Sequence, residues 1–509
     1  MTQLTIAAPG GTVERVRLRR TSSPVGGHAP YHPYFDYDRP MPAATSRRSE
    51  RDALYERYRA RIRTSPHLDR TLVSFQANRN MPGFGWLKYK EAFSAPLAAD
   101  VIQRYTSPGD VVLDPFAGIG TTIFAARRLG RRPIGIELLP VGVSVMEARL
   151  SAEAVNAPAF RRRVTALAGE DWQGHFDEAH ELAHIAITRG AFPPATERAL
   201  AGYRAYCANR LRNPHERRLF QLAGLSILER ISYTRKDGQY LRWDCRARRP
   251  GVGGVRGVRS TFTKGRIEPF SEAIDRQLAR IGAELGDVAG GPEPDLRCGS
   301  CLDVLPRLDE ASVDLVLTSP PYCNRYDYTR TYALELVYLG LGDGDVKRLR
   351  QTMLSCTVEN AAKVQQLRRA YAAAGRDDVC ARIVGVFERQ RALGEVLALL
   401  RDRGRAGLLN NANVPRMVEN YFFEMCFVVA ELSRVLRPGG RLVMVNDNVR
   451  YAGEEVPVDL ILSDFARRLG LVVERIWTLA RGKGNSSQQM GAHGRRELRK
   501  CVYVWKKKN

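Results

Sequence analysis

Hydrophobic and polar positions over residues 97–137 follow a pattern typical of helix, strand, helix and strand in turn. Apolar residues spaced for one helical face predict an amphipathic helix over 97–105, and short apolar runs predict strands over 110–114 and 133–137. A turn with two glycines and a helical stretch over 121–129 separate these strands. Such a βαβ unit predicts a parallel sheet covered by helices.

The same alternation returns later in the chain. A buried strand is expected over 313–318. The pattern then predicts a helix over 421–436, a strand over 441–446, a helix over 459–469 and closing strands that reach Trp505. A shorter helical stretch is expected over 51–63. We expect the two halves to supply one parallel sheet, so the predicted fold class is α/β.

Segments that lack this alternation divide the sheet domain. A chain of 509 residues is longer than one typical core requires, so we expect large insertions. The expected organisation is a flexible N-terminal arm over 1–50, the first half of the sheet domain over 51–150, an inserted region over 151–297, a motif-bearing segment over 298–342, a helical insertion over 343–412 and the closing half of the sheet domain over 413–509.

A glycine-containing motif, Asp-Pro-Phe-Ala-Gly-Ile-Gly-Thr-Thr, starts at Asp114, where the first strand ends. Gly118 and Gly120 allow a tight turn close to a ligand, and the following helix offers unpaired N–H groups. The loop lacks the third glycine of dinucleotide-binding loops, and Asp114 would repel a pyrophosphate but could pair with the ammonium group of a methionine moiety. Glu137 ends the next strand, where a carboxylate can bind ribose hydroxyls; the alternative is an ordinary helix-cap acid. The pattern indicates a nucleoside-cofactor site.

A second motif, Thr-Ser-Pro-Pro-Tyr, follows the strand over 313–318 and is therefore expected beside the cofactor crevice. Two adjacent prolines fix the backbone and form a rigid acceptor platform. The Ser319 hydroxyl and the Pro320 carbonyl could accept hydrogen bonds from an exocyclic amine and orient its lone pair for attack on a methyl group. Tyr322 would stack on the base, which must leave the duplex to reach such a pocket.

Together the two motifs resemble those of the DNA amino-methyltransferases, and residues 90–94, Lys-Glu-Ala-Phe-Ser, resemble the motif that precedes them in that family. The resemblance implies a Rossmann-like methyltransferase fold that uses S-adenosylmethionine. It implies cofactor contacts from Phe93, Ser94, Asp114, Pro115, Phe116, Gly118, Gly120, Thr121, Thr122 and Glu137, and a catalytic tetrapeptide of Ser319, Pro320, Pro321 and Tyr322. Where the family often has Gly-Asp, this chain has Gly299-Ser300, so either Ser300 or Asp303 would contact the cofactor adenine.

The resemblance also favours a target base. Serine at the first position of the tetrapeptide goes mostly with methylation of the cytosine 4-amino group, and aspartate goes mostly with the adenine 6-amino group. We therefore expect a site-specific cytosine-N4 DNA methyltransferase that is the modification partner of a restriction endonuclease or belongs to a defence system. The alternatives are an adenine-N6 DNA methyltransferase, an RNA base methyltransferase and a non-catalytic DNA-binding subunit.

The charge agrees with a nucleic-acid partner. The chain has 79 Lys and Arg against 55 Asp and Glu, a net charge of +24 at pH 7, which suits double-stranded DNA. Basic, amide and aromatic residues interleave over 231–266, which a solvated basic loop could also explain. Glycines combine with amides and cations over 481–495, which a plain flexible loop could also explain. The candidate DNA contacts there are Arg235, Lys236, Gln239, Arg242, Gln488 and Arg495. We expect no membrane span, and nine scattered cysteines fit a reducing, cytoplasmic compartment.

Two metal-like patterns are interpreted as chance matches. His180-Glu-Leu-Ala-His184 matches the zinc-protease motif and would place both imidazoles on one helical face, but no third ligand is identifiable. Cys298 and Cys301 have zinc-knuckle spacing without a second pair at a suitable distance. We therefore predict no metal site.

Overall fold

The computed structural model describes residues 49–237, 240–247, 261–288, 290–480 and 498–509. The predicted arm over 1–50 therefore lies outside the described residues, apart from its last two. Ser49 caps helix α1 (Glu50–Tyr58) by accepting a hydrogen bond from the Asp52 amide. Within the described residues, no helix is both long and apolar enough to cross a bilayer.

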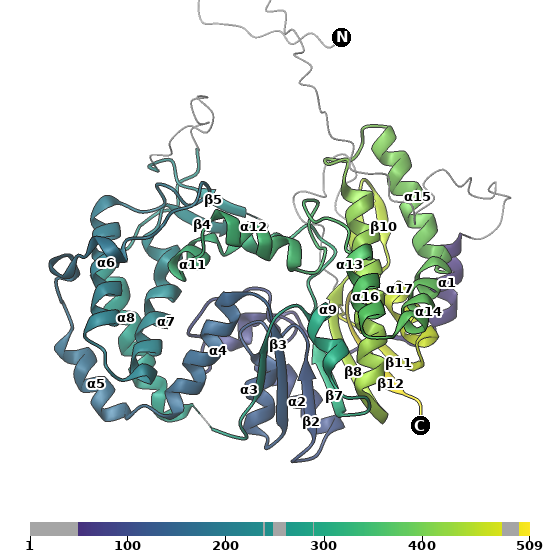
Figure 1. Cartoon of the computed structure of the whole chain (residues 1–509), viewed down its shortest axis with the longest axis horizontal. Coiled ribbons are helices and arrows are strands. Elements are labelled where there is room, and N and C mark those ends of the chain that lie inside the picture. The colour runs from purple at the N-terminus through teal and green to yellow at the C-terminus, as the bar shows by residue number, and fades with distance from the viewer. Residues whose placement is uncertain (1–48, 238–239, 248–260, 289, 481–497) are drawn as a thin grey trace, which may run out of the picture. The chain divides into compact units, whose positions relative to one another are not determined.

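The centre of the fold is an eight-stranded sheet with the order β1-β11-β12-β8-β7-β2-β3-β6 (Figure 1). Its strands are β1 (Ile62–Thr64), β2 (Val111–Asp114), β3 (Arg132–Glu137), β6 (Asp295–Cys298), β7 (Val313–Thr318), β8 (Leu436–Asp447), β11 (Leu471–Thr478) and β12 (Lys500–Lys507). The α/β class, with a Rossmann-like sheet, is confirmed. The prediction of one parallel sheet is corrected, because β12 lies antiparallel between β11 and β8.

Helices cover both faces of this sheet. Helices α2 (Ala95–Tyr105), α3 (Thr121–Arg128) and α4 (Pro140–Glu153) pack on one face, and α9 (Cys301–Val304), α16 (Val414–Val435) and α17 (Val458–Arg468) pack on the other. Side chains that alternate along β12 contact the helices on opposite faces of the sheet. Val502 and Val504 belong to the apolar cluster that includes residues of α2. The Trp505 indole donates to the Ser463 hydroxyl of α17, at 3.2 Å.

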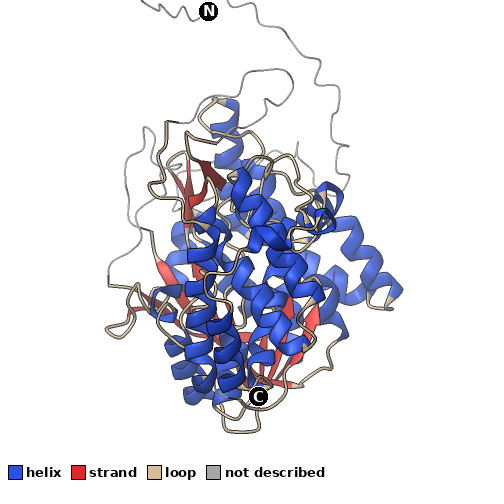
Figure 2. Ribbon diagram, turned by 90° about the vertical axis from the view of Figure 1, so that its left-hand side faces the viewer, coloured by secondary structure: helices blue, strands red, loops and turns tan. Residues whose placement is uncertain are grey.

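The inserted region forms its own helical layer, seen at the left of Figure 1 and in front in Figure 2. It contains α5 (Ala157–Ala166), α6 (Pro194–Asn209), α7 (Pro214–Ile231) and α8 (Phe270–Glu284), with a hairpin of β4 (Thr234–Asp237) and β5 (Tyr240–Trp243). Its buried side chains are continuous with those of α4. The main sheet resumes at Asp295, because β6 pairs with β3, so the region ends three residues earlier than the predicted boundary.

Two further segments differ from or extend the prediction. The helix expected over 51–63 ends at Tyr58, and Ile62–Thr64 forms the edge strand β1, which pairs with β11. Residues 343–412 contain four helices. These are α12 (Asp343–Thr352), α13 (Val364–Ala373), α14 (Asp377–Glu388) and α15 (Arg391–Arg405). The last two pack against α16.

Candidate active site

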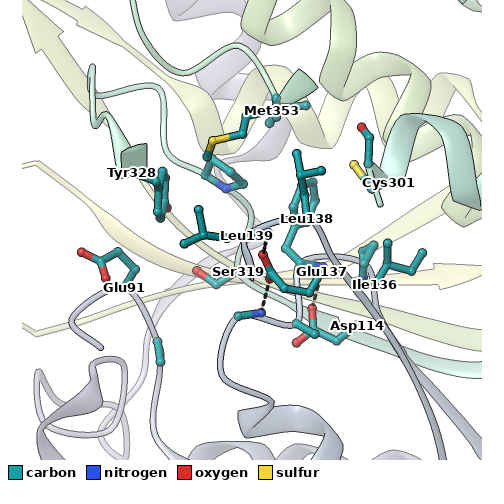
Figure 3. Close-up of a pocket in the computed structure, with 18 of the residues that line it drawn as sticks. Glu91, Asp114, Ile136, Glu137, Leu138, Leu139, Cys301, Ser319, Tyr328 and Met353 are labelled. Atoms are coloured by element: carbon teal, nitrogen blue, oxygen red, sulfur yellow. Dashed lines mark hydrogen bonds between the residues drawn. The ribbon is translucent and has the colours of Figure 1, made fainter. Parts of the chain in front are cut away.

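A cavity opens at the carboxyl edge of the sheet, where β2, β3 and β7 end. It is lined by residues 89, 91–93, 114–118, 121, 136–139, 299–301, 319, 321, 328, 353 and 354. Seven of the ten predicted cofactor contacts are among them; the other three are Ser94, Gly120 and Thr122. Figure 3 shows Glu91 and Tyr328 together, on the other side of Ser319 from Ile136 and Cys301.

The Asp114 carboxylate ties the glycine-containing loop to the neighbouring strand. Its Oδ1 accepts hydrogen bonds from the Phe116 amide (3.1 Å) and the Thr318 hydroxyl (2.6 Å). Its Oδ2 accepts one from the Thr122 hydroxyl (2.7 Å). Burial raises the pKa of Asp114 to about 6, although these hydrogen bonds oppose the shift. Asp114 thus fixes the loop against α3 and β7. Its pairing with an ammonium group stays a prediction.

The Glu137 carboxylate, at the end of β3, bridges the two loops beside the cavity. Oε2 accepts a hydrogen bond from the Gly118 amide and Oε1 one from the Leu139 amide, each at 2.6 Å, as the dashed lines in Figure 3 show. Burial raises the pKa of Glu137 to about 7. Each carboxylate oxygen can accept more than one hydrogen bond. Glu137 therefore fixes the segment that precedes α4, and it can still accept hydroxyl donors from a ligand.

The start of α3 presents polar groups to the cavity. Gly120 caps this helix with φ of +81°, and a Cβ atom there would lie 2.8 Å from the Phe124 and Met146 side chains. Thr121 follows, and its buried Oγ1 has no hydrogen-bond partner among the described residues. An unpaired hydroxyl at a helix N-terminus is a feature expected of a site for an anionic ligand group.

The tetrapeptide after β7 reaches the same cavity. Ser319 and Pro321 line it, and Pro320 is buried. The Ser319 hydroxyl donates to the Tyr322 hydroxyl at 3.3 Å, and the Lys500 ammonium lies 5.9 Å from the centre of the Tyr322 ring. The two predicted motifs therefore meet at one cavity, although stacking of Tyr322 on a base stays a prediction.

The structure also distinguishes neighbours within the motifs. Phe93 lines the cavity, whereas Ser94 is fully buried and its hydroxyl caps α2 by accepting from the Leu97 amide. We therefore correct the interpretation of Ser94 from a direct cofactor contact to a helix cap. Ser300 lines the cavity and also caps α9, whereas Asp303 lies within that short helix and is not among the lining residues.

Several residues of the site were not found from the sequence. Glu91 lies in the predicted motif over 90–94 and Tyr89 directly precedes it, but the motif gave no reason to choose either residue. Tyr328, Met353 and Leu354 belong to no motif; the last two come from the segment interpreted only as a helical insertion. A buried cluster around Glu424 holds the loop that carries Met353 and Leu354.

This cluster joins the loop after α12 to α16. The Glu424 carboxylate, fully buried on α16, accepts hydrogen bonds from the Ser355 amide (2.8 Å) and hydroxyl (2.5 Å). The Lys363 ammonium lies 3.1 Å from the same carboxylate. The buried ion pair and its hydrogen bonds therefore fix the segment that brings Met353 and Leu354 to the cavity.

The predicted DNA contacts divide within the hairpin. Arg235 and Arg242 are opposite each other in the β4–β5 register, and both side chains are exposed. Lys236 lies on the other face, with a side chain only 4% exposed and paired with Glu335. Because β-strand side chains alternate between faces, Lys236 faces the core, and its prediction as a phosphate contact is corrected. Outside the described residues lie Gln239, Gln488 and Arg495.

The two metal-like patterns have local explanations. His180 ends a short 3₁₀ helix and pairs with Asp177 at 3.0 Å, whereas His184 lies outside any helix and pairs with Glu197 at 2.9 Å. Cys298 ends β6 and Cys301 begins α9. Among the described residues, no group of three or more His, Cys, Asp or Glu side chains is arranged to hold a metal ion.

The chain is similar to known DNA methylases and Type II methyltransferases. Residues 43–145 match the family model described as DNA methylase. The chain is 44% identical over 466 residues to the Type II methyltransferase M.AvaI of Nostoc sp. and to that of Anabaena variabilis, a match that covers 89% of this chain and 92% of each relative. It is 38% identical over 480 residues to the Type II methyltransferase M.BsoBI of Geobacillus stearothermophilus, covering 90% and 92%.

The fold and the cavity at its carboxyl edge are those of a Rossmann-like methyltransferase. Within that class, the chain belongs to the DNA amino-methyltransferase family, as the two motifs predicted.

Proposed function

We propose that the chain is a site-specific DNA methyltransferase that transfers a methyl group from S-adenosylmethionine to the 4-amino group of cytosine. One observation carries this proposal: Ser319 lines the same cavity as Gly118 and Glu137. A donor bound against the loop would therefore be adjacent to the acceptor platform. The serine at the first position of the tetrapeptide favours cytosine over adenine.

The cavity fits S-adenosylmethionine in its donor and acceptor groups. Glu137 retains acceptor capacity for ribose hydroxyls, and the Thr121 hydroxyl at the start of α3 suits a carboxylate. Ser300, Cys301 and Ile136 supply the wall on the side where the adenine would lie. When bound, this cofactor supplies an electrophilic methyl group on a sulfonium.

The chain itself would supply positioning and electrostatics. The amine hydrogens would be bonded by the Ser319 hydroxyl, acting as acceptor, and by the Pro320 carbonyl, which orients the nitrogen lone pair. Burial holds the pKa of the Tyr322 phenol above its ordinary value, so the hydroxyl stays protonated beside Ser319. Tyr322 would then offer a neutral ring on which a flipped base can stack.

We propose that the inserted region reads the DNA. Arg235 and Arg242 form an exposed cationic pair on one face of the hairpin, and the Arg242 guanidinium lies 4.2 Å from the centre of the Phe262 ring. Such arginines suit phosphates and base edges of double-stranded DNA. The similarity to Type II methyltransferases supports a role in a restriction-modification system with a cognate endonuclease.

The test is a product analysis. Purified protein is incubated with methyl-labelled S-adenosylmethionine and mixed-sequence duplex DNA or RNA, and the digested nucleosides are identified by mass. We expect 4-methylcytosine in DNA. Labelled 6-methyladenine would keep the enzyme and overturn the assignment from Ser319, and label in RNA alone would overturn the substrate class. A protein that binds DNA and leaves both substrates unlabelled would be a non-catalytic subunit.

A further inference from the structure

A series of buried polar contacts links the DNA-reading hairpin to the wall of the cavity. It begins at Lys236 on β4, whose ammonium lies 2.5 Å from Glu335 Oε1 of α11 (Ala333–Tyr338). The same ammonium lies 4.1 Å from the centre of the Tyr332 ring. The side chains of Lys236 and Glu335 are 4% and 2% exposed, so this ion pair is inside the protein.

The series continues from Tyr332 to Glu91. The Tyr332 hydroxyl donates to Glu91 Oε2, and the Tyr326 hydroxyl donates to Glu91 Oε1. Burial and the neighbouring carboxylate hold the pKa of both phenols well above the ordinary value of tyrosine, so both remain donors. The Tyr332 ring also stacks on Tyr89 with centroids 5.1 Å apart.

Glu91 and Tyr89 are both in the cavity wall. Figure 3 shows Glu91 beside Tyr328 and away from Glu137. The two phenol donors leave the Glu91 carboxylate little freedom to turn. A fixed carboxylate at this wall gives the cavity a defined negative charge, which suits a cationic methyl donor. Tyr332 contacts both this carboxylate, through its hydroxyl, and the Lys236 ammonium, through its ring.

We propose that Lys236 is a positioning residue for methyl transfer, which acts through Tyr332 on the Glu91 carboxylate and so links the placement of the hairpin to the cavity. This inference rests on the proposed function of the hairpin as the DNA-reading element. Arg235, the neighbour of Lys236, points to the opposite, exposed face of β4. One strand therefore carries a candidate DNA contact outward and the anchor to the cavity inward.

The chemistry of the ion pair supports positioning over stability. A buried lysine and carboxylate lose hydration that their attraction only partly offsets, so apolar residues of similar volume are often as stabilising. A buried ion pair does, however, require a defined geometry of both groups. A second contact also connects β4 to the cavity wall. The Lys90 ammonium donates to the Lys236 carbonyl at 2.8 Å and so joins the strand to the segment that contains Glu91.

The test is a double-mutant cycle on kcat with Lys236→Met, Glu91→Gln and the double variant. Assays use saturating cofactor and DNA, at a temperature well below the unfolding of every variant. We expect each single variant to lower kcat about tenfold and the double variant to lower it about tenfold as well, since residues that act as a unit are not additive. Lys236→Met should leave the KM for DNA unchanged, whereas Arg235→Ala should raise it.

Lys264→Met is the matched control for a purely structural effect. The Lys264 ammonium donates to the Ser232 carbonyl at 2.7 Å in the same inserted region and is not part of the series. Its loss should destabilise the region without coupling to Glu91→Gln. Multiplicative losses in the Lys236 and Glu91 cycle, or an unchanged kcat in Lys236→Met, would overturn the inference.

The label is counted in whichever base and nucleic acid the wild-type enzyme modifies. An adenine or RNA product would therefore overturn the proposed function, while the cycle would still give its own answer on Lys236.

Discussion

The Gly118 amide and the Glu137 carboxylate, 19 residues apart in sequence, are joined by a hydrogen bond of 2.6 Å. The bond holds the glycine-containing loop after β2 against the end of β3, and it directs a half-buried carboxylate into the cavity. The loop and the acid that sequence motifs identify separately are thus one structural unit. Ionisation of Glu137 should consequently affect both stability and ligand binding.

Glu137→Gln is expected to remove a pH-dependent part of the free energy of unfolding. The folded protein raises the pKa of this carboxyl to about 7 from its ordinary value of 4.5. The folded state therefore binds the proton more tightly, so this contribution to stability is present at low pH and is lost as the pH rises through about 7. Urea unfolding should show the wild-type protein losing more stability than the variant between about pH 5 and pH 8. The exposed Glu147 of α4, changed to Gln, is the control, and equal losses in wild type and Glu137→Gln would contradict the prediction.

Tyr322→Ala is expected to lower kcat by about a hundredfold, because the base loses the surface that positions it beside Ser319. The affinity for S-adenosylhomocysteine, measured by calorimetry, should not change, since the ring is not part of the cavity wall. Tyr322→Phe keeps the ring and should retain most of the turnover. Full activity of the alanine variant would show that the base is held elsewhere.

Arg235→Ala is expected to weaken DNA binding and reduce its salt dependence. If the arginine neutralises one phosphate, its removal should make the slope of log affinity against log salt less negative by about 0.9. Fluorescence anisotropy with a labelled duplex at several salt concentrations measures this slope. Arg104→Ala, on the exposed side of α2, provides the comparison. A slope equal to that of the comparison variant would move DNA recognition away from the hairpin.

Lys363→Met is expected to destabilise the fold by about 3–5 kcal/mol, because it leaves the buried Glu424 carboxylate without its cation. The double variant Lys363→Met/Glu424→Leu should recover most of that loss, since no charge then remains buried. Chemical unfolding of the three variants and the wild type tests both statements, with Glu424→Leu alone as the third variant. A Lys363→Met protein as stable as the wild type would show that Ser355 alone satisfies Glu424.

The sheet domain was predictable because each of its central strands is short, apolar and bounded by turns. β2, β3 and β7 were located within two residues, and the helix predicted over 121–129 between β2 and β3 corresponds to α3. The direction of β12 was not predictable, since periodicity identifies a strand but not its neighbours. The strand at Ile62–Thr64 was missed because three residues at a sheet edge carry no period of their own.

The site was predictable where a motif coincides with a strand end. Asp114, Glu137 and Ser319 reach the cavity for that reason. Lys236 was misassigned because a basic residue in a basic segment has the same composition whether it faces solvent or Glu335. The contribution of Met353 had no sequence signal, since it depends on a buried ion pair between residues 61 positions apart.

The shared core of α4 and the inserted region has a consequence for engineering. Val141 and Val145 of α4, which follows the cofactor-side strand β3, belong to the same buried cluster as Leu219 and Ile274 of α7 and α8. The inserted region is therefore not a detachable module. A chimera that takes this region from a relative should fold well only when the matching α4 comes with it. A transplant meant to change sequence preference must therefore include part of the first half of the sheet domain.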